Sequence, residues 1–319
     1  MCIRDSSCSA SIGITLFGEP GETADTLLVH ADLAMYRAKD AGRNTLCFFD
    51  PQMQTELSAR VVLEEDLREA LQQHQFNVHY QAQVDAQGRI TGVEALLRWQ
   101  HPTRGWVSPV EFIPKAEKTG LILPLGLWVL KVACDQLALW AKRAETAHLQ
   151  LAVNVSARQF RDSDFVSQVL ETVRSSGANA KLLKLELTES VLAANVEDVV
   201  MKMNTLKAAG IGFSLDDFGT GYSSLSLIKR LPLDYLKIDQ SFVRNILLDP
   251  DDAAIAKMVI VLASTMGVQV IAEGVETMEQ RDLLEMLGCH NYQGYLFSRP
   301  VPIEAFEALV TLDPGSSPG

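Results

Sequence analysis

The sequence predicts an α/β fold: a (β/α)₈ barrel with an antiparallel first strand, preceded by a truncated α+β fragment. From Phe76 onward, eight strand-like segments alternate with helical segments over about 235 residues. Helices that precede strands commonly end at a glycine, which readily adopts the left-handed conformation that terminates helices. These glycines are Gly177, Gly210, Gly267 and Gly288. The turn over residues 85–88 joins the first two strands directly, so the first strand should run antiparallel to the second.

Hydrophobic periodicity gives the expected elements of the barrel. The expected strands are 76–84, 90–99, 149–157, 181–189, 210–218, 234–240, 268–275 and 291–298. The expected helices are 110–119, 123–143, 163–176, 196–209, 223–230, 251–267, 277–288 and 302–311.

The remaining segments define the expected domain organisation. Residues 1–8 fit neither a strand nor a helix pattern and are interpreted as non-native. Residues 1–50 contain two strands and one helix, which bury too little surface to fold alone, and read as the end of a larger domain. Residues 51–62 are expected to be a helical linker, 63–311 the barrel and 312–319 a disordered tail.

Composition excludes several classes of function. The chain has 319 residues, is 47% hydrophobic and 21% charged, and carries a formal net charge of −12. A protein that coats a nucleic-acid polymer would be basic. The five cysteines form no C-x-x-C pair, which indicates reduced thiols and a cytoplasmic location. No uninterrupted apolar run reaches the roughly 18 residues of a membrane span, so we expect no membrane segment in this chain, although a parent protein with further upstream regions could be membrane-anchored.

Polar side chains recur late in six expected strands, always in the alternation phase opposite the apolar residues. They are Glu94, Asn154, Glu186, Asp216, Asp239 and Glu273. The carboxyl ends of barrel strands meet at one mouth, so these groups should share a site. Two negative charges about 4 Å apart repel by about 4 kcal/mol at an effective dielectric near 20. The site must therefore take up protons or cations, and its oxygen-only donors favour Mg²⁺ or Mn²⁺ over zinc.

Two features of this site suit the cleavage of a phosphoester. Adjacent Asp216 and Asp217 can share a site only if the strand breaks between them, and the glycine-rich sequence that follows allows such a break. Lys237 and Arg98 add positive charge in the same phase. Structural alternatives remain open: Lys237 could pair with Asp239, Arg98 could pair with Glu94, and Glu189 could be a charge at a helix N-terminus.

Seven motifs carry a family resemblance, and they occur in order over about residues 63–310. They are EALLRW (94–99), NVSARQF (154–160), ELTES (186–190), DDFGTGYSSL (216–225), LKIDQSFV (236–243), AEGVE (272–276) and QGYLFSRP (293–300). Together they closely resemble EAL-domain cyclic-di-GMP phosphodiesterases. The resemblance implies hydrolysis of cyclic di-GMP to linear pGpG with two Mg²⁺ or Mn²⁺ ions.

The resemblance also assigns roles to individual residues. The first metal would be held by Glu94, Asn154, Glu186 and Asp216, and the second by Asp216 and Asp217, with Glu273. Glu273 would be the general base, Lys237 would hold the catalytic water, and Glu189 would position the DDFGTG loop. Substrate would contact Arg98, Gln81, Gln293 and Asp239, while the supporting residues would be Glu276, Gly219, Thr220 and Gly221. Ala82 departs from the family pattern, which usually has proline there; this could loosen the first strand.

Residues 9–50 resemble the C-terminal end of a GGDEF diguanylate cyclase domain, through SIGI, ADLAMYRAKDAGRN and FFD. The signature loop of that domain is absent here, so no cyclase activity is expected. The resemblance further suggests a homodimer through barrel helices near the DDFGTG loop. Two alternatives to the phosphodiesterase remain: a non-catalytic receptor for cyclic di-GMP, and an unrelated metal-dependent barrel hydrolase.

Overall fold

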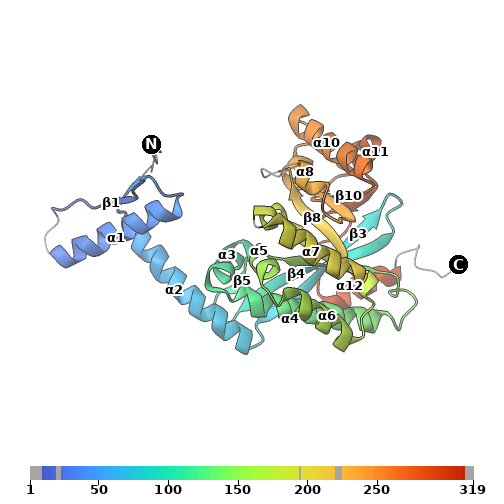
Figure 1. Cartoon of the computed structure of the whole chain (residues 1–319), viewed down its shortest axis with the longest axis horizontal. Coiled ribbons are helices and arrows are strands. Elements are labelled where there is room, and N and C mark those ends of the chain that lie inside the picture. The colour runs from blue at the N-terminus through green and yellow to red at the C-terminus, as the bar shows by residue number, and fades with distance from the viewer. Residues whose placement is uncertain (1–8, 19–22, 194, 220–224, 313–319) are drawn as a thin grey trace, which may run out of the picture. The chain divides into compact units, whose positions relative to one another are not determined.

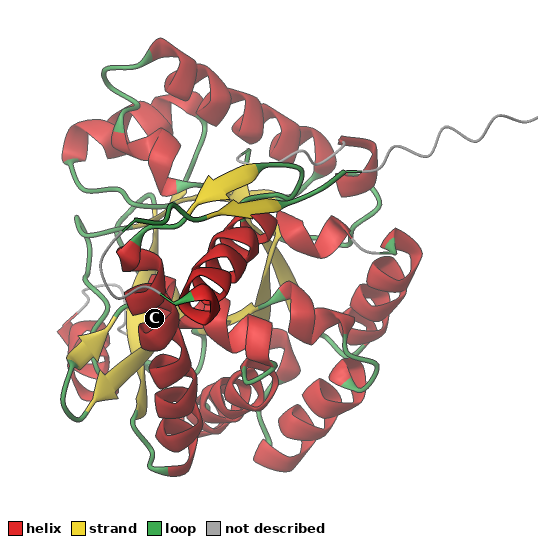
Figure 2. Ribbon diagram, turned by 90° about the vertical axis from the view of Figure 1, so that its left-hand side faces the viewer, coloured by secondary structure: helices red, strands yellow, loops and turns green. Residues whose placement is uncertain are grey.

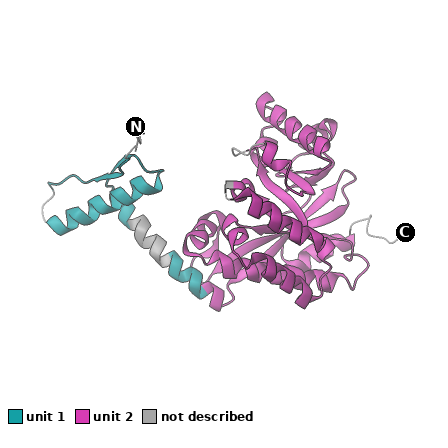
Figure 3. Ribbon diagram, in the orientation of Figure 1, with its two compact units in different colours: residues 1–69 teal, residues 70–319 magenta. Residues whose placement is uncertain are grey.

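The computed structural model describes residues 9–18, 23–193, 195–219 and 225–312, without the side chains of residues 55–62, 193 and 225. The chain divides into two compact units, residues 1–69 and residues 70–319 (Figure 3). The helix α2 (Pro51–Gln72) contains the boundary between them.

The first unit contains two parallel strands, β1 (Ile12–Ile14) and β2 (Leu46–Phe48), connected by helix α1 (Ala24–Asp40). Thr23 begins the helix, because its hydroxyl accepts a hydrogen bond from Thr26 N at 3.2 Å. Several apolar side chains of this unit are at least half exposed. They are Ile12, Leu16, Phe17, Leu28, Val29, Tyr36, Leu46 and Phe48.

The second unit is a closed barrel of eight strands, as the sequence predicts. In order around the barrel they are β3 (Phe76–Asp85), β11 (Asn291–Gln293), β10 (Gln269–Ala272), β9 (Tyr235–Ile238), β8 (Gly212–Phe218), β7 (Leu183–Thr188), β6 (Gln150–Val155) and β4 (Ile90–His101). The pairing of β3 with β4 closes it, and β3 is antiparallel to both neighbours, which confirms the predicted first strand. A short strand, β5 (Gly105–Val107), pairs only with β4.

Helices alternate with the barrel strands (Figures 1 and 2). The longer ones are α3 (Pro109–Thr119), α4 (Ile122–Trp140), α6 (Phe165–Ser176), α7 (Val196–Ala208), α10 (Pro250–Met266), α11 (Met278–Leu287) and α12 (Ile303–Leu312). The shorter ones are α5 (Ala157–Arg161), α8 (Leu225–Ile228) and α9 (Gln240–Arg244), with 3₁₀ turns η1 (Ala180–Leu182) and η2 (Glu189–Ala193). Left-handed glycines end α6, α10 and α11 at Gly177, Gly267 and Gly288, as expected.

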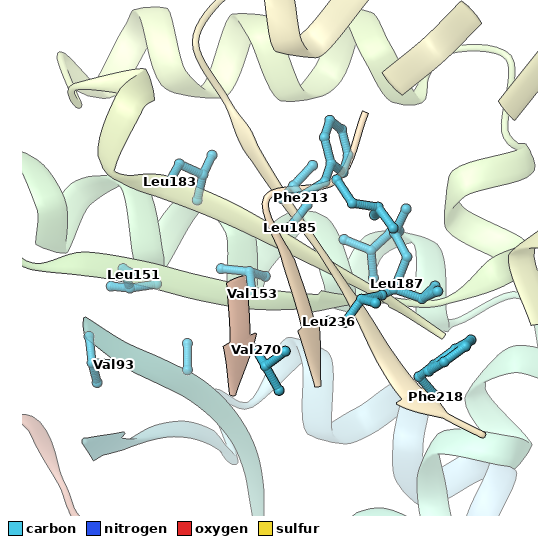
Figure 4. Close-up of a cluster of buried hydrophobic side chains, with 14 of the residues drawn as sticks. Val93, Leu151, Val153, Leu183, Leu185, Leu187, Phe213, Phe218, Leu236 and Val270 are labelled. Atoms are coloured by element: carbon cyan, nitrogen blue, oxygen red, sulfur yellow. The ribbon is translucent and has the colours of Figure 1, made fainter. Parts of the chain in front are cut away.

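Both faces of the central strands are buried. Leu183, Leu185 and Leu187 of β7 point to the apolar layer between strands and helices (Figure 4). Lys184 and Glu186 point the other way, and they are also only 3% and 1% exposed. The second face of this strand therefore lines the inside of the barrel, where charged groups must find partners.

Some elements differ from the sequence-based expectation. The helices α5 and α9 have five residues each, too few to show a helical period, and were not expected. The last strand is shorter than expected, because only Asn291–Gln293 pair with a neighbour. By length and composition α4 could cross a membrane, although no uninterrupted apolar run of that length occurs in it. Its residues Leu125, Ala133 and Leu137 are buried within this unit, as in the core helix of a barrel.

Candidate active site

The side chain of Lys237, from β9, lies at the centre of the predicted site. Its ammonium is 2.7 Å from Glu186 Oε2, 3.4 Å from Glu94 Oε2 and 3.4 Å from Asp216 Oδ1. It also forms an ion pair with Glu273. We call Glu94, Glu186, Asp216 and Glu273 the carboxylate cluster. The structure thus brings together side chains from five strand ends, and Lys237 pairs with this cluster rather than with Asp239.

Burial and mutual repulsion set the protonation of the cluster. Desolvation raises the pKa of Glu186 to about 8, and the charges of Glu94 and Asp216 act in the same direction, against Lys237. Desolvation also raises the pKa of Asp216 and, much more strongly, that of Glu273. The four nearby carboxylates hold the pKa of Lys237 well above its usual value despite its complete burial.

Glu94 differs from the other cluster members because amide donors stabilise its charge. Asn154 Nδ2 donates to Glu94 Oε1 at 2.5 Å, and Gln293 Nε2 donates to Glu94 Oε2 at 2.6 Å. Burial alone would raise the pKa of Glu94, but Lys237 and these two amides lower it. Glu94 is therefore the cluster member that stays ionised most readily.

The strand break that Asp216 and Asp217 require is present. The pairing of β8 with β9 shifts register between Leu215 and Phe218, and Asp217 has a φ of +55°. Asp216 thereby faces the cluster while Asp217 N donates to Asp216 Oδ1 at 3.0 Å. Burial, then the charges of Asp216 and Asp239, raise the pKa of Asp217 to about 6. This places Asp217 close to the cluster and beside Asp239.

Glu189, in η2, contacts the start of the DDFGTG loop. Its Oε1 accepts a hydrogen bond from Gly219 N at 3.0 Å, and its Oε2 is buried without a partner among the described residues. Gly219 has a φ of +100°, and a Cβ there would lie 3.1 Å from the ring of Phe242. Glu189 therefore contacts the segment that the resemblance assigns to it. Thr220 and Gly221 lie outside the described residues.

The expected substrate residues lie at different depths. Gln81 and Gln293 are buried and bonded within the barrel: Gln293 Nε2 donates to Gln81 Oε1 at 3.1 Å, and Gln81 Nε2 donates to Ser298 O at 3.0 Å. Arg98 is partly buried, donates to Leu97 O at 2.9 Å, and has its pKa lowered by that burial.

Asp239 and Glu276 lie outside the carboxylate cluster. Asp239 caps α9 by accepting from Ser241 N at 2.9 Å. The side chain of Glu276 is exposed.

Two residues in this network were missed from the sequence. Gln83 Nε2 donates to Gln293 Oε1 at 2.9 Å, and Ser298 Oγ accepts from Ala82 N at 3.0 Å. Gln83 shares the alternation phase of Gln81, which was the available signal. Ser298 offers no such signal, because it follows the end of β11. The bond to Ser298 fixes the backbone at Ala82, where a proline would lack the donor.

The site residues fit a divalent cation by charge and by donor type. Four carboxylates and one ammonium carry a formal charge of −3 when all are ionised. Glu186 Oε1 is buried with no hydrogen-bond partner among the described residues, as a free ligand oxygen would be. Across the described ranges, no three His, Cys, Asp or Glu side chains are arranged as a metal centre, because the cluster is drawn onto Lys237.

Comparison with known proteins supports the interpretation of both units. The model of the EAL domain matches residues 64–300, and that of the diguanylate cyclase GGDEF domain matches residues 3–45. The bifunctional diguanylate cyclase/cyclic di-GMP phosphodiesterase MucR of Pseudomonas aeruginosa is 45% identical over 95% of this chain. The cyclic di-GMP phosphodiesterase PdeR of Escherichia coli is 40% identical over 94% of it. The chain spans 44% of MucR and 45% of PdeR.

A solved structure gives the same result for the fold. The PaMucR phosphodiesterase in complex with c-di-GMP is 44% identical, with a TM-score of 0.74, over 77% of this chain and 99% of that one. The family model covers all seven motifs. The chain belongs to the EAL domain family.

Proposed function

We propose that the barrel hydrolyses one phosphodiester bond of cyclic di-GMP and releases linear pGpG. The observation that carries this proposal is the convergence of four carboxylates, three of them buried and that of Glu273 partly buried, on Lys237 inside the barrel. The activities named for MucR and PdeR, and the ligand of the PaMucR structure, support cyclic di-GMP as the substrate.

We propose that Mg²⁺ or Mn²⁺ binds at the cluster, through Glu94, Asn154, Glu186 and Asp216 for one ion and Asp216 and Asp217 for a second. The unpartnered Glu186 Oε1 and the excess negative charge support this assignment. When bound, a divalent cation would supply an acidified water and neutralise charge on the phosphate. Asn154 and Gln293 each donate a side-chain hydrogen bond to Glu94 and hold its carboxylate in place.

The proton transfer is assigned to Glu273. Its carboxylate forms an ion pair with Lys237, and burial raises its pKa, so it binds a proton more strongly than an exposed glutamate does. Lys237 keeps a positive charge beside the reacting phosphate and orients both Glu186 and Glu273. Glu189 fixes the loop that begins at Gly219. Arg98, Gln81, Gln293 and Asp239 remain the candidates for contact with substrate.

The test is incubation of the full chain with cyclic di-GMP and Mg²⁺ or Mn²⁺, followed by chromatography of the nucleotides. We expect pGpG from the wild type, none when the divalent ion is removed, and retained binding with cleavage reduced by at least about a hundredfold in Glu273→Gln. Binding without any product in the wild type would support a non-catalytic receptor instead. An unimpaired rate in Glu273→Gln would remove Glu273 from the reaction.

We also propose that residues 1–50 are the end of a GGDEF domain without cyclase activity, followed by a linker and a catalytic barrel over residues 63–311. The match over residues 3–45 supports the first part.

The free thiols of Cys47, Cys134 and Cys289 support a cytoplasmic location, where cysteines are kept reduced. Exposed apolar residues near the first turn of α10 and along it support a homodimer; they are Leu247, Leu248, Met258 and Val261. Light scattering of the purified chain would test the dimer.

A further inference from the structure

A second cavity opens at the end of the barrel opposite the carboxylate cluster. Its volume is about 440 Å³, within the range of small-molecule sites. Its lining includes Gln150, Tyr235 and Asn291, which are the first residues of β6, β9 and β11. Gly92, Lys184 and Tyr235 also line it, and each precedes by two residues a member of the proposed active site, Glu94, Glu186 or Lys237. The cavity therefore lies nearer the amino-terminal ends of these strands than the proposed active site does. We call it the lower cavity.

Lys184 supplies a buried positive charge to the lower cavity. Its side chain is 3% exposed, and its ammonium lies 3.6 Å from the centre of the Tyr235 ring. No carboxylate, carbonyl or hydroxyl in the described part of the chain accepts a hydrogen bond from Lys184. A buried ammonium ordinarily has such acceptors, because loss of its hydration is costly.

The acidic residues closest to the lower cavity are already paired. Asp85 forms an ion pair with Arg89 at 2.7 Å and accepts a hydrogen bond from Arg89 N at 3.0 Å. Asp234 forms an ion pair with Lys207 and accepts from Phe213 N at 2.8 Å. Lys184 is therefore a buried charge lining this cavity that forms no ion pair with the described residues.

Gln150 adds a hydrogen-bond donor to the same wall. Its carboxamide oxygen accepts from Tyr235 Oη at 3.2 Å, which leaves the amide N–H groups without an acceptor among the described residues. The ring of Tyr235 thus contacts the ammonium of Lys184 while its hydroxyl orients Gln150. An ammonium and a carboxamide N–H on one wall form a donor set for oxyanions.

We propose that the lower cavity binds a small oxyanion, a carboxylate or a phosphate, through Lys184 and Gln150. The remaining lining is mixed, so the ligand would carry both polar and apolar groups. The uncharged polar side chains are those of Gln83, Thr91, Gln269 and Asn291, and the apolar ones are those of Ile90, Ile271 and Val310. If Lys184 has only a structural role, an apolar side chain of equal length should replace it without any change in anion binding. If Lys184 binds the ligand, the same replacement should weaken that binding. The proposal is independent of the activity at the opposite mouth.

The test is isothermal titration of the metal-free full chain with inorganic phosphate and, separately, with acetate, at constant ionic strength. Because Lys184 lies outside the carboxylate cluster, the Lys184→Met variant separates binding at the lower cavity from binding at the proposed active site. We expect the wild type to bind at least one probe with a dissociation constant in the millimolar range or tighter. Lys184→Met should weaken that binding about tenfold or more, the usual effect of losing a charged hydrogen bond. The probe that binds tells which oxyanion the cavity prefers.

Lys181→Met is the matched control, since Lys181 is an exposed lysine at the same end of the barrel. Its binding should equal that of the wild type. If Lys184→Met does not fold, Tyr235→Phe keeps the ring and removes only the hydroxyl that orients Gln150, and should weaken binding severalfold. Failure of both probes to bind the wild type overturns the proposal. So does unchanged affinity in a folded Lys184→Met or, failing that, in Tyr235→Phe.

Discussion

Lys237 Nζ lies 2.7 Å from Glu186 Oε2, while the second oxygen of the same carboxylate, Oε1, is buried without a donor among the described residues. One carboxylate oxygen of Glu186 is thus paired with the Lys237 ammonium, whereas the other has neither a hydrogen-bond donor nor a cation beside it among the described residues. This arrangement is unfavourable unless a proton or an external cation completes it.

Replacement of Lys237 by methionine would remove the positive charge with which all four carboxylates of the cluster form ion pairs. We expect Lys237→Met to lower the free energy of unfolding of the metal-free protein by about 3 kcal/mol, because breaking a buried ion pair leaves charge uncompensated. Urea unfolding measures this directly. Lys181→Met, an exposed lysine, should change it by less than about 0.5 kcal/mol. A stability of Lys237→Met equal to that of the wild type would refute the central position of Lys237.

The raised pKa of Glu186 makes stability depend on pH. The carboxyl ionises near pH 4.5 in the unfolded chain and near pH 8 in the folded one, chiefly because of burial. Between these values the folded state binds the extra proton, so rising pH favours unfolding by up to about 1.4 kcal/mol per unit. The pKa values of Asp216 and Glu273 are also raised, so their ionisation likewise lowers the stability of the fold as pH rises. The destabilisation is absent below the pKa of Glu186 in the unfolded chain and complete above its pKa in the folded one.

Urea unfolding at pH 5, 6 and 7 without divalent ions would measure this slope. The Glu186→Gln variant has lost the titrating group, and its stability should fall less steeply over the same range. Equal slopes in the two proteins would show that Glu186 does not hold its proton in the folded state.

Glu189 should act through the loop that begins at Gly219. Removal of the hydrogen bond from Gly219 N in Glu189→Ala should lower kcat about tenfold, equivalent to about 1.4 kcal/mol, with little effect on overall stability. Glu171→Ala, which removes an exposed carboxylate of α6, is the control. Steady-state hydrolysis of cyclic di-GMP provides the comparison. An unchanged kcat in Glu189→Ala would show that the hydrogen bond from Gly219 N to Glu189 does not contribute to catalysis.

The alternation of side chains along each strand was enough to predict the barrel and the shared phase of its polar groups. It also predicted that a break is needed at Asp217, and the structure has a positive φ there. Alternation predicts which face of a strand a side chain occupies, but not how far along the barrel interior it lies. It could therefore not show that Lys237 Nζ lies among the carboxylates. Contacts made after the strands end, such as Ser298 with Ala82, depend on tertiary packing that periodicity does not encode.

The alternation of side chains could not predict the lower cavity either. Lys184 and Glu186 share one phase of β7, yet they face opposite ends of the barrel interior. Only the registers of neighbouring strands place Lys184 beside Ala152 and Gly212, where no side chain is large enough to pair with it.

Titration of the protein with Mn²⁺, with Glu186→Gln as the comparison, tests the central claim most directly. The cluster should bind the ion in the wild type and release protons as it does so, since carboxyls with raised pKa values must ionise to become ligands. Glu186→Gln should bind the ion at least about tenfold more weakly. Equal affinity in the two proteins, or binding without proton release at pH 7, would contradict the account.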